Sequence, residues 1–113
     1  MGDRGQILIK DTGVYLYTHW DATNLINVVR KVISRKDRWN DSEYLTRMLF
    51  SEMTKGSEFE STGFGIGTEE HGDIWRLITI DCENQIVSLG EDGNEVKLSF
   101  QDFIDESENK STN

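Results

Sequence analysis

Residues 13–20 read GVYLYTHW, and this stretch decides the fold that we predict. Two sets of side chains alternate along it, namely Val14, Leu16 and Thr18, and Tyr15, Tyr17 and His19. A period of two is typical of a β-strand whose two faces differ chemically. The stretch also carries the densest group of functional side chains in the sequence, so a site is expected on this strand or beside it.

The length and composition indicate a single folded domain. A chain of 113 residues is typically one domain, and its aromatic residues supply enough apolar area for a modest core. The single cysteine, Cys82, excludes an intramolecular disulfide. The sequence contains neither an apolar run of about 18 residues nor the hydrophobic segment of a secretory signal. A cytoplasmic protein without a membrane span is therefore expected.

The net charge of −9 is unevenly distributed. Residues 1–50 hold eight Lys and Arg against six Asp and Glu, whereas residues 51–113 hold four against fifteen. This acidic balance argues against binding to double-stranded nucleic acid, which depends on neutralising phosphates. The basic residues between Arg30 and Arg38 form a local exception. They fit either a solvated helix end or an anion site completed by Arg47 or Trp39.

The hydrophobic pattern predicts two helices in the middle of the chain and strands on both sides. Leu25, Val29 and Val32 recur at helical spacing, and Asn40 or Asp41 can cap a second helix that ends near Gly56. The helices are expected at residues 24–36 and 41–55, and the strands at residues 6–10, 13–20, 63–68, 74–81, 86–89 and 96–98.

The resulting order is β-β-α-α-β-β-β-β. This order predicts an α+β fold, with a mostly antiparallel sheet and both helices on one face. The domain is expected to span residues 1–104, with one helical turn at residues 99–104 that covers a sheet edge. Residues 105–113 are polar and are expected to form a mobile tail that can be deleted with little loss of stability.

Four separated motifs resemble an uncharacterised family of small proteins from bacteria, prophages and phages. They are Gly2-Asp3-Arg4, the GVYLYTHW strand, the helix pattern with Trp39, Asp41, Tyr44, Leu45, Arg47, Phe50 and Met53, and Thr62-Gly63-Phe64-Gly65-Ile66. The match covers roughly residues 2–66, but the chain departs from it at Asp21-Ala22, where relatives place small residues. The resemblance implies no assigned activity. It implies a bacterial or mobile-element setting, in which small proteins often inhibit a host factor.

Five residues are candidate ligand-binding residues: Tyr17, His19, Trp20, Trp39 and Arg47. If the helix pair packs on the side of Tyr15, Tyr17 and His19, Arg47 and Trp39 come within reach and complete a pocket for a planar anion. The alternative is that the two tyrosines are core aromatics. The spaced glycines Gly63, Gly65 and Gly67 indicate a close approach by another residue, with Trp75 or Tyr17 as the expected neighbour.

Three functions remain open on this sequence. We rank first a non-enzymatic protein that binds or inhibits a protein partner, second a binder of a nucleotide-like anion, and third a small hydrolase that uses His19 with Asp21 or Asp41. We leave enzymatic activity open but rank it below binding, because no nucleophile accompanies His19 at a known spacing. No cofactor and no metal are predicted, and a homo-oligomer is compatible with the sequence.

Overall fold

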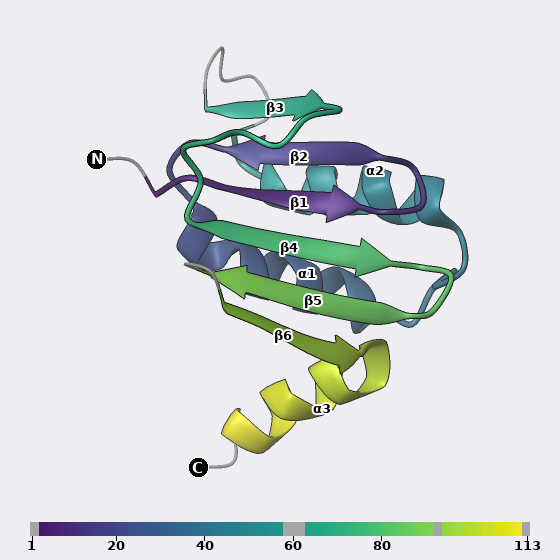
Figure 1. Ribbon diagram of the computed structural model, residues 1–113. Helices are drawn as coiled ribbons and strands as arrows, with labels where there is room; N and C mark the ends of the chain where they lie inside the picture. Colours follow the sequence, from purple (N-terminus) through teal and green to yellow (C-terminus); the bar gives the residue numbers. More distant parts are fainter. Residues whose placement is uncertain (1–2, 58–62, 92–93, 112–113) are drawn as a thin grey trace.

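The computed structural model is an α+β domain in which three helices accompany a six-stranded sheet (Figure 1). It describes residues 3–57, 63–91 and 94–111. The strands are β1 (Gly5–Ile9), β2 (Val14–Thr18), β3 (Phe64–Gly67), β4 (Arg76–Asp81), β5 (Ile86–Glu91) and β6 (Asn94–Ser99). The helices are α1 (Leu25–Ile33), which follows a short 3-10 helix, η1 (Ala22–Asn24), then α2 (Ser42–Met53) and α3 (Phe100–Ser111).

The strand order in the sheet is β3-β2-β1-β4-β5-β6. All neighbouring pairs are antiparallel except β1 and β4, in which Ile7 lies beside Ile78. The predicted sheet, mostly antiparallel, is thus confirmed, with β1 and β4 as the parallel exception. After β2 the chain passes through both central helices behind the sheet and returns as β3, antiparallel to β2 and so in the direction of β1. It then crosses the other face to β4, which runs in this same direction beside β1.

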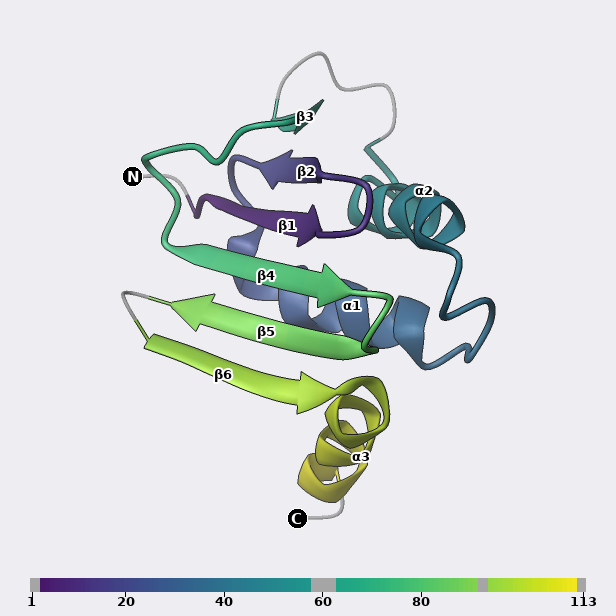
Figure 2. The same ribbon diagram turned by 45° about the vertical axis from the view of Figure 1, so that its right-hand side comes forward.

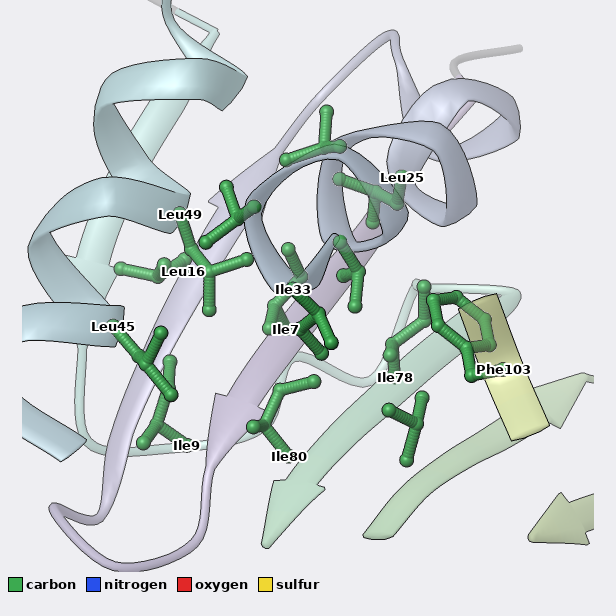
Figure 3. Packing of buried hydrophobic residues seen from close by; sticks show 14 of the residues in the cluster. Ile7, Ile9, Leu16, Leu25, Ile33, Leu45, Leu49, Ile78, Ile80 and Phe103 are labelled. Carbon is green, nitrogen blue, oxygen red and sulfur yellow. The ribbon is translucent and has the colours of Figure 1, made fainter. Parts of the chain in front are cut away.

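The core lies on one face of the sheet, under α1 and α2, as predicted (Figures 1 and 2). The residues Ile7, Ile9, Leu16, Ile78 and Ile80 meet Leu25, Ile33, Leu45 and Leu49 from the two helices (Figure 3). All nine side chains are 1% exposed or less. Burying them contributes roughly 1.5–3 kcal/mol each relative to exposure, so this contact dominates the free energy of folding.

The two central helices begin and end close to their predicted bounds. Of the two capping candidates, Asp41 is the residue used, because its carboxylate accepts a hydrogen bond from Tyr44 N at 3.1 Å. Helix α1 carries Arg30 and Lys31 in its last turn, where cations interact favourably with the helix dipole.

The third helix is longer than the single turn that the sequence predicted. Ser99 Oγ accepts a hydrogen bond from Asp102 N at the start of α3, and Phe100, Phe103 and Ile104 bury one stripe against α1 and β6. The chain then continues as helix to Ser111, through residues that were expected to form the mobile tail. Figure 2 shows α3 beyond β6, at the edge of the sheet. The tail's tolerance to deletion stays a prediction.

Residues Asp3 and Arg4 attach the start of the chain to the rest of the domain. The carboxylate of Asp3 accepts hydrogen bonds from Thr23 N at 2.8 Å and from Trp75 Nε1 at 2.6 Å. Arg4 forms an ion pair with Asp73 at 2.8 Å. Two members of the motif at residues 2–4 therefore have a structural role, while Gly2, like Thr62 of the fourth motif, lies outside the described residues.

Candidate binding surface

The second face of the sheet carries side chains from β1, β2 and β4 that no helix covers in the described part of the chain. We call this the open face and define it by Gln6, Leu8, Tyr15, Tyr17, Leu77 and Thr79. Leu16 is buried in the core, so the period of two turns Tyr15 and Tyr17 away from the helices. The helix pair therefore does not pack on the tyrosine side, which was the condition for the predicted pocket. Figure 1 looks onto the open face, with the helices behind.

A segment between β3 and β4 crosses one end of the open face. This crossing segment, residues 68–73, is exposed along its length. Gln6 lies beneath it and is only 1% exposed. The amide of Gln6 donates to Glu69 O at 3.2 Å and accepts from His71 N at 2.9 Å. These two hydrogen bonds fix the crossing segment to the sheet and explain why a polar side chain is buried there.

Tyr17 lies between the two histidines of the chain. Its hydroxyl is 3.0 Å from Nδ1 of His19, and its ring stacks on His71 with 4.3 Å between centroids. Burial raises the pKa of Tyr17, the negative charge of Asp73 raises it further, and the positive charge of Arg4 opposes them. A phenol with a raised pKa keeps its proton at neutral pH and can donate it to His19.

Trp20 follows β2, and its indole packs over Gly63 as well as beside His19. Its ring contacts Phe64 edge-on at 5.9 Å and His19 edge-on at 6.1 Å. A Cβ atom on Gly63 would lie 2.2 Å from the indole, and Gly63 has a φ of +100°. The predicted close approach is thus present at Gly63, where Trp20 makes it, while the predicted neighbour Tyr17 lies beside Gly65 and Trp75 does not take part. Trp20 remains 48% exposed.

Trp39 and Arg47 do not join these residues. Trp39 packs edge-on against Phe100 at 5.3 Å, and its indole donates to Ile33 O at 3.0 Å, which is a structural position at the end of α1. Arg47 is exposed on α2, with its guanidinium 5.6 Å from the ring of Tyr44. The five candidate residues therefore do not converge on one pocket. The arginine that is buried is Arg76, which the sequence reading did not single out.

The geometry gives little support to a hydrolase that uses His19. Asp21 accepts a hydrogen bond from Asn24, and Asp41 caps α2, so the hydrogen bonds found for these two carboxylates lead away from His19. Burial first, and then the negative charge of Asp11, raise the pKa of Cys82 to about 12, so its thiol is a poor nucleophile. Within the described residues, no group of three or more His, Cys, Asp and Glu side chains is placed to hold a metal ion.

A hollow of about 300 Å³ lies on the open face beside the crossing segment. Its lining includes Glu70, Ile74, Trp75, Leu77, Gly90 and Glu95. It exists partly because Gly90, opposite Leu77 in the sheet, has no side chain. Two larger hollows, of about 700 and 660 Å³, lie at the start of α2 and are both lined by Arg38, Asp41 and Glu43 among others.

The comparisons with known proteins assign neither a family nor an activity. No family model matches the chain, and neither a curated protein nor a solved structure matches it. In the part of the chain that the structure describes, no helix combines the length and apolar character needed to span a bilayer. The functional argument therefore depends on the geometry of this chain alone.

Sequence reasoning identified the strand but not the segments that complete the surface. His71 was not among the candidate ligand-binding residues, and Gln6 was expected only as part of the strand at residues 6–10. A polar residue inside the run QILIK at residues 6–10 was the available signal, because a central strand buries a polar side chain only with a partner. The partner, the crossing segment, is more than sixty residues away in sequence.

Proposed function

We propose that this protein is a non-enzymatic binding protein and that the open face of its sheet contacts a protein partner. In the bacterial or mobile-element setting that the sequence resemblance implies, it would act by occupying a surface of a host protein. The observation that carries the proposal is the character of this face. Leu8, Tyr15, Tyr17 and Leu77 are half-buried there, and they lie outside the set of side chains that pack against the core.

Side chains of this kind support a protein interface in particular. Aromatic residues are enriched at the centres of protein interfaces, because they bury a large area and lose few rotamers. A sheet face also presents them on a rigid support, so little conformational entropy is lost on binding. Trp20 is exposed beyond the end of β2, where its ring contacts His19 and Phe64.

Binding of a nucleotide-like anion has less support. Arg38 and Arg47 both lie against the ring of Tyr44, at 4.9 and 5.6 Å, beside the hollow of about 660 Å³. That hollow is also lined by Asp37, Asp41 and Glu43, so its three carboxylates exceed its two guanidinium groups. An anion would enter a site with no positive balance, and this disfavours the second function.

Site-specific photo-crosslinking tests the proposal. A photoreactive phenylalanine analogue would replace Tyr15 on the open face in one variant and Lys31, an exposed residue of α1, in a matched control. In cells that naturally express the protein, we expect position 15 to yield one discrete crosslinked protein and position 31 to yield none. Equal yields at both positions, or no crosslink at position 15, would contradict the proposal.

A further inference from the structure

We propose that the hollow beside the crossing segment receives an arginine side chain of the protein partner. This inference deepens the proposed function and rests on it. It begins with the shape of the hollow, whose floor is Leu77 and the bare backbone of Gly90 and whose lining includes Ile74 and Trp75. A volume of about 300 Å³ lies at the lower end of the range for ligand pockets and has room for one long side chain.

The charges around the hollow favour a cation. Its lining contains three carboxylates, of Glu70, Glu91 and Glu95, against one guanidinium group, that of Arg76. Glu91 lies 2.5 Å from Arg76, so these two charges compensate each other. Glu95 has only a distant, exposed contact with Lys97 at 3.9 Å. Glu70 and Glu95 are thus left as the negative charges available to a partner.

Arg76 does not oppose a second cation. Its guanidinium also donates to Ala22 O at 3.0 Å and to Thr23 O at 3.1 Å, so it is held by acceptors of this chain. Its Nε atom has no hydrogen-bond partner among the described residues, but that atom is buried and closed to a docked side chain. The positive charge that a partner meets is therefore small.

The Trp75 ring already carries the Arg76 guanidinium 4.4 Å from its centroid, so a partner side chain would meet mainly the apolar floor and the carboxylates. This combination still fits arginine better than lysine. A guanidinium group is planar and weakly hydrated, so it packs on apolar and aromatic surface while its N–H groups reach carboxylates. An ammonium group is compact and strongly hydrated, and it loses more on entering such a hollow. The overall charge of −9 further attracts a partner with a basic surface.

A titration of the whole protein with N-acetyl-argininamide, followed by NMR, tests the inference. We expect saturable shifts of the Trp75 indole and of the Gly90 and Leu77 amides, with a dissociation constant on the order of millimolar. The neutral isostere N-acetyl-citrullinamide should cause no such shifts. The double variant Glu70→Gln/Glu95→Gln should weaken arginine binding about fivefold.

A second double variant, Glu83→Gln/Asp102→Asn, is the matched control. It removes the same number of exposed carboxylates outside the hollow and should leave the affinity within about twofold of the wild type. Equal shifts with the citrulline probe, shifts spread over the acidic surface, or an equal loss in the control variant would overturn the inference. Such a failure would leave a crosslink at position 15 intact. If the hollow binds the arginine probe but position 15 gives no crosslink, the proposed contact of the open face with a protein partner would be overturned instead.

Discussion

Gly63 shows how a single residue shapes the end of the candidate surface. Its φ of +100° disfavours any other residue, and a Cβ atom would overlap the ring of Trp20. We expect Gly63→Ala to displace Trp20 and to lower the free energy of unfolding by roughly 2 kcal/mol, measured by urea denaturation. Gly67→Ala is the control, because a Cβ atom there meets open space. Equal stability of the two variants would contradict this account.

Asp3 makes stability depend on pH in a predictable direction. Burial alone would raise the pKa of Asp3, but the hydrogen bonds from Thr23 and Trp75 and the charge of Arg76 outweigh it. They lower the pKa below its ordinary value of 3.8. A depressed pKa in the folded state means that the contribution is present above pH 3.8 and is lost as the pH falls through the folded pKa.

Replacing this carboxylate tests that dependence. We expect Asp3→Asn to lose about 1–3 kcal/mol at pH 7, because an amide cannot accept both of the hydrogen bonds that the carboxylate accepts. The difference from wild type should be smaller at pH 3, because below pH 3.8 the stabilisation from the charged carboxylate is progressively lost. Urea denaturation at both pH values measures it, with the exposed Glu83→Gln as the control. A difference that stays constant with pH would show that Asp3 does not titrate with folding.

At the scale of elements, α3 consists of an apolar first turn and a polar remainder. Phe103 is fully buried and lies 4.6 Å from the guanidinium group of Arg30. We expect Phe103→Ala to cost roughly 3 kcal/mol of unfolding free energy, whereas deletion of residues 105–113 should lower the melting temperature by only a few degrees. Calorimetry on both variants compares them. A loss on deletion as large as that of Phe103→Ala would show that the polar turns also anchor the helix.

The elements themselves were predictable from the sequence, because each has a local cause. The period of two gave β2, the helical stripe through Leu25 and Val29 gave α1, and the Asp41 cap marked the start of α2. The face of β2 that meets the helices was not predictable, because a strand period shows that two faces differ but not which one is covered. The aromatic face drew attention, yet the smaller Leu16 fits between Leu45 and Leu49 (Figure 3).

Contacts between distant segments explain the remaining differences. The parallel pairing of β1 with β4 and the hydrogen bonds of Gln6 to the crossing segment join residues far apart in sequence. No local pattern encodes such a pairing. The predicted site failed for the same reason, since Trp39 and Arg47 were placed beside Tyr17 only through an assumed packing of the helices.

At the scale of the whole molecule, the central claim is that one face of the sheet is built to be covered by helices and the other is left for a partner. Thiol labelling of two threonine positions tests this claim directly. Thr79 lies on the open face and is half-buried, whereas Thr18 is fully buried on the helix side. Cysteine has nearly the volume of threonine, so either replacement fits the space of the original side chain. The buried hydroxyl of Thr18 has no hydrogen-bond partner among the described residues, so replacing it by a thiol breaks no hydrogen bond found there.

The labelling rates of Thr79→Cys and Thr18→Cys with iodoacetamide, under native conditions, are therefore the decisive measurement. Wild-type protein is the background, since the raised pKa of Cys82, about 12, keeps its thiol unreactive. We predict that Thr79→Cys reacts without unfolding, while Thr18→Cys reacts only as fast as the domain opens. Equal protection at both positions, which would mean that another element or a second copy of the chain covers the open face, would contradict the account.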